Sequence, residues 1–246
     1  RDSAGKLNLW VRPLNALSGQ LLNGTEGAEY PFWSSDSRFI GFFAGGKLRK
    51  IEASGGPPQT ICDAPNGRGG TWNRDGVIVL AAAAGAPLSR VSAAGGSPTT
   101  ITKLDSSRRE VNHRWPHFLP DDKHFLYVTQ TTTAGAAEGD IIYVGSLDTT
   151  ENKILLHANS NMAYAAGHVL FMREQSLMAQ PFDVKSLAFT GDAFPVAEQV
   201  HYNADRSKAI FTVSENGILA YQTGGSVGNS QLVWYDRSGK ELERID

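Results

Sequence analysis

Short apolar runs alternate with Gly, Pro, Asp and Ser along most of the chain. Between residues 30 and 62, apolar segments such as 39–43 are separated by a Ser-Ser-Asp-Ser turn and by Gly45-Gly46. This spacing is typical of short β-strands joined by tight turns. No long stretch shows the period of an amphipathic helix. We therefore predict an all-β protein.

The pattern of strands repeats at an interval of forty residues. Residues 48–61 read LRKIEASGGPPQTI and residues 88–101 read LSRVSAAGGSPTTI, so Leu, Ala, Gly-Gly, Pro, Thr and Ile recur in place. An aromatic residue followed by a turn precedes each copy, at Trp33 and at Trp72. Four-stranded units of about 40–45 residues are the repeat of a β-propeller, whose blades pack their faces against one another. The repeat predicts this fold.

The repeat assigns residues 1–246 to a single β-propeller domain of four-stranded antiparallel blades. Residues 1–25 supply only the outer half of one blade. Five complete blades are predicted at 28–62, 68–102, 112–156, 160–199 and 203–245. We expect a six-bladed propeller with one blade incomplete in this chain. Because the chain begins with Arg1 rather than Met, we also expect a fragment or a processed product.

Two sequence resemblances support this fold. Residues 30–42, YPFWSSDSRFIGF, resemble the Pro-x-Trp-Ser-Pro-Asp-Gly repeat of TolB-type propellers, although Ser35 and Ser37 replace its Pro and Gly. Runs 42–48 and 113–116 are similar to the propeller regions that follow the catalytic domain of bacterial serine/threonine kinases. The second resemblance implies an extracytoplasmic sensor, periplasmic or at the cell surface.

Composition narrows the classes of partner. The formal net charge is −2, so no overall basic field attracts nucleic acid. No apolar run approaches the ~18 residues of a membrane span. We expect no nucleic-acid partner and no membrane insertion by this segment. Cys62 is the only cysteine, which excludes an intrachain disulfide, and we expect a half-buried structural thiol there.

Two patterns suggest catalysis or metal binding, but each has a simpler structural explanation. Residues 224–228, GGSVG, match a Gly-x-Ser-x-Gly nucleophile motif, yet a strand follows them where the motif requires a helix. His113 and His117 flank a proline. In an extended segment they lie about 13 Å apart, too far for one zinc ion with bonds of ~2 Å. We predict no catalytic residue, no metal ligand and no cofactor.

Recurrence at one position of the repeat indicates a structural role for two further sets. The first set occupies the same turn in three blades, where we expect the carboxylates to accept backbone N–H groups: Asp36, Asp75 and Asp121. The second set precedes those turns or occupies a corresponding strand, and we expect it in the core: Trp33, Trp72, Phe118 and Phe211.

Polar residues just before each innermost strand form the candidate ligand-binding site. These positions lie at the mouth of a propeller's central channel, where propellers usually bind. A solvated rim is the alternative, because loops are polar in general. The candidates are Glu29, Tyr30, Arg68, His113, Arg114, Asn161, Tyr164, Asn203, Asp205 and Arg206.

The sequence leads us to expect a non-catalytic recognition or sensor module within a larger bacterial protein. It would present the channel-mouth loops to a protein or peptide, or to a small ligand or glycan. The alternative is the propeller domain of a hydrolase or lyase: a peptidase-gating propeller, a lactonase or a polysaccharide lyase. The last two need metal ligands or a base at the channel, where the candidates include one histidine. A structural spacer is the third possibility.

Overall fold

The computed structural model describes residues 7–132, 140–203, 206–224, 232–235 and 240–245. Within them the one helical element described in full is a 3₁₀ turn, η1 (Ser106–Arg108), and nearly all other regular structure is strand. The predicted all-β class is therefore confirmed. In this described part of the chain, no helix has the length and apolar character needed to cross a bilayer.

The chain divides into two compact units. Unit 1 comprises residues 1–106 and 111–118, and unit 2 comprises residues 107–110 and 119–246. Strand β11 (Glu110–Phe118) begins in unit 2 and continues in unit 1. Each unit is described separately below.

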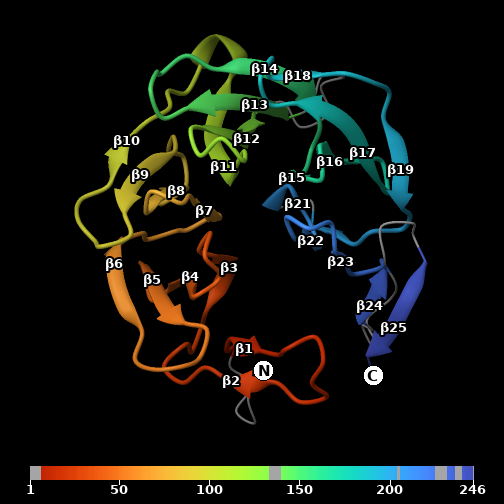
Figure 1. Ribbon diagram of the computed structural model, residues 1–246. Helices are drawn as coiled ribbons and strands as arrows, with labels where there is room; N and C mark the ends of the chain where they lie inside the picture. Colours follow the sequence, from red (N-terminus) through yellow and green to blue (C-terminus); the bar gives the residue numbers. More distant parts are fainter. Residues whose placement is uncertain (1–6, 133–139, 204–205, 225–231, 236–239, 246) are drawn as a thin grey trace. The chain divides into compact units, whose positions relative to one another are not determined.

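Unit 1 contains a two-stranded hairpin and two four-stranded antiparallel sheets (Figure 1). Strands adjacent in sequence are adjacent in each sheet, as expected for a chain with a tight turn after every strand. The hairpin pairs β1 (Trp10–Val11) with β2 (Gln20–Leu21). The first sheet consists of β3 (Glu29–Trp33), β4 (Phe39–Ala44), β5 (Lys47–Glu52) and β6 (Gln59–Asp63), and the second of β7 (Gly70–Trp72), β8 (Val77–Leu80), β9 (Ser89–Ser92) and β10 (Thr99–Thr100).

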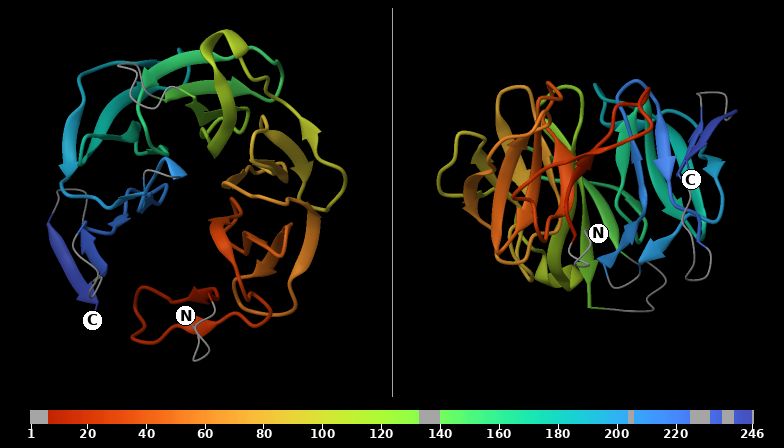
Figure 2. Two further views of the ribbon diagram at one scale, coloured as in Figure 1. Left: turned by 180° about the vertical axis from the view of Figure 1, so that it is seen from behind. Right: turned by 90° about the horizontal axis from the view of Figure 1, so that it is seen from below.

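The first sheet of unit 1 buries both of its faces. Phe43 and Leu48 pack with Ile78 and other residues of the second sheet. On the other face, Phe42 packs with Leu22 beside the hairpin. In Figures 1 and 2 the hairpin (red), the first sheet and the second sheet follow one another in this order. This arrangement explains why apolar residues recur on both sides of each strand.

Two expectations about side chains in unit 1 need correction. Trp33 is 51% exposed, so its predicted place in the core is wrong. The equivalent Trp72 stacks on Phe39 of the preceding sheet with ring centroids 6.0 Å apart. In the described residues, the sheet before Trp33 is only the β1–β2 hairpin and has no counterpart of β4. Cys62 is buried rather than half-buried, and burial raises the pKa of its thiol to about 11.

Unit 2 is built from further antiparallel sheets. Strands β12 (His124–Thr131), β13 (Ile141–Ser146) and β14 (Lys153–His157) are neighbours in that order. A five-stranded sheet follows, with β15 (Ala163–Ala165), β16 (His168–Arg173), β17 (Ser176–Asp183), β18 (Ala188–Phe189) and β19 (Phe194–Ala197). The remaining strands are a hairpin, β20 (Tyr202–Asn203) and β21 (Lys208–Ala209), and a four-stranded sheet, β22 (Phe211–Val213), β23 (Leu219–Tyr221), β24 (Leu232–Tyr235) and β25 (Glu241–Ile245).

The five-stranded sheet of unit 2, β15 to β19, has one strand more than the predicted four-stranded repeat. Strand β17 is eight residues long and has two short partners on one edge. Leu177 pairs with Ala197 of β19 near its start, and Phe182 pairs with Phe189 of β18 near its end. The length of β17 therefore accommodates two strands where the repeat predicts one.

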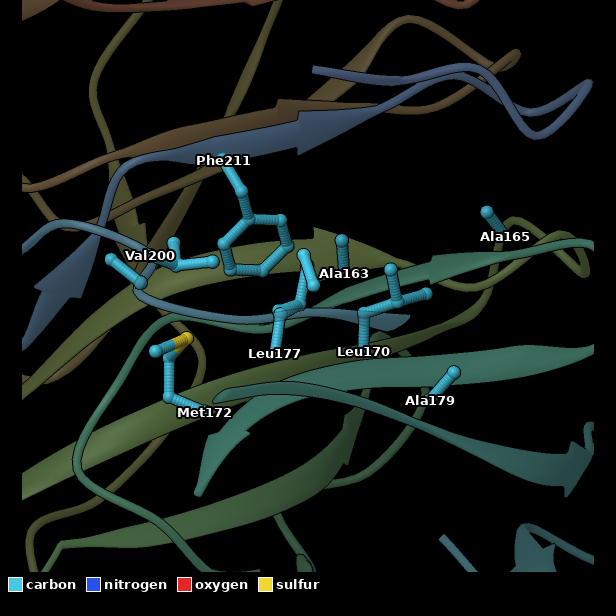
Figure 3. Packing of buried hydrophobic residues seen from close by; sticks show 10 residues of the cluster. Ala163, Ala165, Leu170, Met172, Leu177, Ala179, Val200 and Phe211 are labelled. Carbon is cyan, nitrogen blue, oxygen red and sulfur yellow. The ribbon is translucent and has the colours of Figure 1, made fainter. Parts of the chain in front are cut away.

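The core of unit 2 lies between the five-stranded sheet and β22. Phe211 of β22 points toward Leu177 and Ala163, and all three are buried (Figure 3). Ala163 of β15 lies beside this aromatic ring, and its small side chain leaves room for it. The predicted core position of Phe211 is thus confirmed.

The turn after β11 is held by Asp121, as the repeat predicts. Its Oδ1 accepts the backbone N–H groups of Lys123 at 3.1 Å and His124 at 2.9 Å. Asp36 accepts the N–H of Arg38 in the equivalent turn at 3.1 Å. In the turn between them Asn73 has this role, because its Oδ1 accepts the N–H of Val77 at 2.8 Å while Asp75 is exposed.

We expect Asp121→Ala to lower the free energy of unfolding at pH 7 by about 1–2 kcal/mol, through the lost hydrogen bonds. Asp75→Ala is the matched control and should change the free energy of unfolding by less than ~0.5 kcal/mol. Burial acts to raise the pKa of Asp121, but hydrogen bonds from His124 and the backbone lower it below 3.8 overall. This stabilisation is present above the unfolded-state pKa and is lost as pH falls through the folded-state value. Urea unfolding at pH 7 and pH 3 tests both points, and equal losses in the two variants would contradict the assignment.

Candidate functional site

Hydrogen bonds and ring contacts join residues of different strands and loops into one cluster in each unit. The unit 1 cluster is defined by Tyr30, Arg68, Asn112, Arg114 and Trp115. The unit 2 cluster is defined by Gln130, Asp140, Asn161, Ser207 and Lys208.

In the unit 1 cluster, a guanidinium lies over an aromatic ring. The Arg68 Cζ is 5.9 Å from the centroid of the Tyr30 ring. The Tyr30 ring meets the ring of Trp115 edge-on, with centroids 4.9 Å apart. The Trp115 N–H donates to the Arg68 carbonyl at 3.0 Å, which joins the start of β7 to β11. Three segments distant in sequence therefore meet at one point.

The backbone of this cluster is strained. Tyr30 and Trp115 have φ values of 50° and 52°, in the left-handed region that costs a side-chain-bearing residue about 1–2 kcal/mol. Gly69 has a φ of 92°, and a Cβ there would lie 2.7 Å from Trp115 Cε3. Such conformations persist only where surrounding contacts hold them, and they concentrate at functional sites. The strain marks this cluster as a candidate site.

The remaining members of the unit 1 cluster and the residues beside it differ in their surroundings. Arg114 Nε donates to Asn112 Oδ1 at 2.7 Å, and Asn112 is buried. His113 is 1% exposed and its Nδ1 lies 2.8 Å from Thr102 Oγ1. It therefore lies in the interior of unit 1. Glu29 is exposed at the start of β3.

In the unit 2 cluster, Asn161 fixes the backbone on both sides of Lys208. The Asn161 N–H donates to the Ser207 carbonyl at 3.0 Å. Its side-chain Oδ1 accepts the N–H of Ala209 at 2.7 Å. Asn161 is itself buried, so these bonds are shielded from water. Lys208 is consequently held in a defined position at the start of β21.

A hydrogen-bonded network supports the residue before the lysine. Ser207 is buried, with a φ of 47° in the left-handed region. Its Oγ donates to Asp140 Oδ2 at 2.8 Å and accepts from Gln130 Nε2 at 2.8 Å. The Asp140 N–H in turn donates to Asn159 Oδ1 at 2.8 Å. The network ties together segments more than sixty residues apart in sequence.

Burial changes the acidity of two groups in this region. It lowers the pKa of Lys208 to about 8. At that pH the amine and ammonium forms are present in comparable amounts, so Lys208 can both accept and return a proton. Burial, together with the nearby Asp140 carboxylate, raises the pKa of Tyr202. Lys208 therefore differs in its acidity from an exposed lysine.

The other residues predicted for the site are distributed around unit 2. Tyr164 packs edge-on against Phe182, with centroids 6.3 Å apart, and burial raises its pKa. Asn203 is exposed and its Oδ1 accepts the N–H of the half-buried Arg206 at 3.2 Å. Asp205 lies outside the described residues, as does Ser226 of the Gly-x-Ser-x-Gly pattern.

The structure thus brings four predicted residues into the two clusters: Tyr30, Arg68, Arg114 and Asn161. Sequence reasoning missed the other six residues of the clusters: Asn112, Trp115, Gln130, Asp140, Ser207 and Lys208. Ser207 and Lys208 directly follow Arg206, so extending the predicted loop by two residues would have included them. Asp140 joins the unit 2 cluster through its hydrogen bond from Ser207, a residue distant in sequence, and the sequence carries no signal for this contact.

Comparisons with solved structures settle the architecture. A putative TolB from Agrobacterium tumefaciens matches with a TM-score of 0.67 at 16% identity, over 94% of this chain and 84% of that chain. The fold is a β-propeller. A calcium-binding protein, regucalcin, from Agrobacterium tumefaciens matches this propeller with a TM-score of 0.64 at 15% identity, over 93% and 75% of the two chains. A gluconolactonase from Xanthomonas campestris matches with a TM-score of 0.65 at 14% identity, over 89% and 75%.

The propeller has no match among protein-family models or curated protein sequences. The structural matches confirm the predicted fold and the likeness to TolB. The blade number, six with one incomplete, stays a prediction. The prediction of a non-catalytic recognition module is corrected, because the same fold is found in an enzyme, the gluconolactonase.

Proposed function

We propose that this propeller is a hydrolytic enzyme of the lactonase type, which opens a cyclic ester by adding water. The observation that carries the proposal is Lys208, held on both sides by Asn161 and given a pKa of about 8 by burial. A general base is most effective when its pKa lies near the working pH. The structural likeness to a gluconolactonase supports the reaction class and suggests sugar-derived lactones as substrates.

The proposed reaction uses the neutral amine of Lys208. The amine takes a proton from a water molecule as the water oxygen bonds to the lactone carbonyl carbon. The ring C–O bond then breaks, and the leaving alkoxide takes the proton back from the Lys208 ammonium. The product is an open-chain hydroxy acid, and the lysine is restored. Asn161 and Ser207 act as positioning residues, because their hydrogen bonds fix the backbone that carries the amine.

The regucalcin likeness raises the question of a calcium ion. Ca²⁺ takes six to eight oxygen ligands, largely from carboxylates and carbonyls. The residues that the structure describes contain no group of three or more His, Cys, Asp or Glu side chains placed to hold a metal. They do not fit a carboxylate-rich calcium centre, and the proposed reaction has no metal step.

We expect the purified chain to accelerate hydrolysis of a sugar δ-lactone, with a rate that rises between pH 7 and pH 9. The apparent pKa of the profile should lie near 8, since only the neutral amine of Lys208 accepts a proton. Proton release in a pH-stat measures the rate, with the spontaneous rate at each pH subtracted. An aliphatic γ-lactone tests whether the sugar hydroxyls are needed. No acceleration of either substrate over buffer would refute the proposed function.

Two finer interpretations accompany this proposal. The partner it requires is a small sugar-derived molecule, one of the partner classes expected from the sequence. The resemblance to TolB and to kinase-borne propellers supports an extracytoplasmic location for the enzyme. Cell fractionation with antibody detection tests the location, and recovery in the cytoplasmic fraction would contradict it.

A further inference from the structure

The charge of Arg68 in unit 1 has no carboxylate partner in the described residues. A guanidinium carries five N–H donors in a planar fork. Within the described part of the chain, the only hydrogen bond from this side chain runs from Nη1 to the Gly67 carbonyl, at 2.8 Å. Lys47, by comparison, is paired with Asp63 at 2.6 Å. Most of the Arg68 donors are therefore available to a ligand.

The surroundings of Arg68 hold the guanidinium in place. One face lies over the Tyr30 ring, whose centroid is 5.9 Å from Cζ. The backbone of Arg68 is fixed by its N–H bond to the Ala81 carbonyl at 2.9 Å and by the bond from Trp115 to its own carbonyl at 3.0 Å. Stacking and backbone bonds reduce the freedom that a surface arginine would lose on binding. The half-buried position strengthens its attraction for an anion relative to full exposure.

Strained backbone surrounds the same guanidinium. The left-handed Tyr30 carries the ring beneath it, and the left-handed Trp115 binds its carbonyl. Gly69 follows it with a φ of 92°, close to Trp115. The fold maintains these costly conformations around a cation that makes no ion pair within the described residues. A functional role for the arginine explains this unfavourable backbone energy better than a structural role does.

We propose that Arg68 and Tyr30 form a binding site in unit 1 for the carboxylate of a small organic acid, such as a sugar acid. A carboxylate lies in the plane of a guanidinium and accepts two parallel N–H bonds from its outer edge. The Tyr30 ring then covers the guanidinium face and offers an apolar surface to the carbon skeleton of the ligand. Arg114 belongs to the strand bonded to Arg68, and its Nε donates to Asn112. The proposed site is built from residues of unit 1 alone and uses no residue of the unit 2 cluster.

The test is calorimetric titration of the full chain with glucuronate and with glucose, which differ by a carboxylate in place of a hydroxymethyl group. We expect glucuronate to bind and glucose not to bind at the same concentrations. Arg68→Gln should weaken glucuronate binding at least tenfold, since it removes the charge and the fork. Arg38→Gln removes the same charge from an exposed position of unit 1 and should leave the affinity unchanged. Thermal unfolding of each variant confirms that it is folded.

Several results would overturn the assignment. Equal binding of glucose and glucuronate would show that the carboxylate is not recognised. Unchanged affinity in Arg68→Gln, or an equal loss in Arg38→Gln, would remove Arg68 from the site. Binding of inorganic phosphate without binding of glucuronate would identify a phosphate site instead. The titration measures binding without turnover. Its outcome therefore does not depend on whether the protein hydrolyses lactones, and the two proposals can fail separately.

Discussion

Lys208→Met should reduce lactone hydrolysis at pH 8 by at least about a hundredfold, the lower end of what general bases contribute. Methionine keeps an unbranched side chain of similar length but accepts no proton. Asn161, Ser207 and the surrounding hydrogen bonds stay in place, so the loss reports on the amine itself. Initial rates with a sugar δ-lactone measure the effect. Lys185→Met, at an exposed lysine of unit 2, is the matched control and should retain activity.

The same variant should be more stable than the wild type at pH 7. Burial lowers the pKa of Lys208 from 10.5 to about 8, so keeping the ammonium in the folded state costs about 3 kcal/mol. Methionine has no such cost and fills the same space. We therefore expect a gain of about 1–3 kcal/mol in the free energy of unfolding, within the limit set by the shift.

The pH dependence of this gain has a definite sign. Between about pH 8 and 10.5 the unfolded wild-type chain binds more protons at Lys208 than the folded chain does. Wild-type stability therefore rises with pH across this window, and the advantage of the methionine variant shrinks. Below about pH 8 the difference stays constant. A Lys208→Met protein that retains activity, or that is less stable than the wild type at pH 7, would contradict the role assigned to the lysine.

The fold could be predicted because its determinants are local and repeated. The Gly55-Gly56 and Gly95-Gly96 pairs all have positive φ, as the repeated turn requires. Asp36 and Asp121 bind backbone N–H groups two residues further on. Each feature lies within a few residues of the strands it connects. Periodicity in one sequence therefore suffices to predict the all-β class and the turns that the repeat shares.

The site could be predicted only in part, because its properties arise from contacts between distant segments. The low pKa of Lys208 depends on burial beside Asn161, which belongs to another strand pair. His113 looks like a rim residue in the sequence, but its bond to Thr102 places it in the interior. Trp33 repeats Trp72 in sequence yet is exposed, because the neighbouring sheet differs. Repeat position predicts the backbone, whereas exposure depends on what packs beside it.

Gly69→Ala should destabilise the chain by about 2–5 kcal/mol, the combined cost of a left-handed alanine and an overpacked contact. The φ of Gly69 is 92°, a conformation that alanine rarely adopts. Its Cβ would lie 2.7 Å from Trp115 Cε3 and 3.2 Å from Trp115 Cα. The second atom is backbone and cannot rotate away, so β11 must shift. Urea unfolding measures the loss.

Gly76→Ala separates the two contributions. Gly76 has a φ of 75°, but a Cβ there would meet nothing within 4 Å. This control should lower the free energy of unfolding by only about 1–2 kcal/mol, because only the left-handed backbone opposes the alanine. The excess loss in Gly69→Ala then measures the close approach of the strand that carries Arg114 and Trp115. Because that strand also binds the Arg68 carbonyl, any folded Gly69→Ala protein should bind glucuronate more weakly than Gly76→Ala does. Equal destabilisation and equal affinity in the two variants would show that the tight packing beside Gly69 does not support the site.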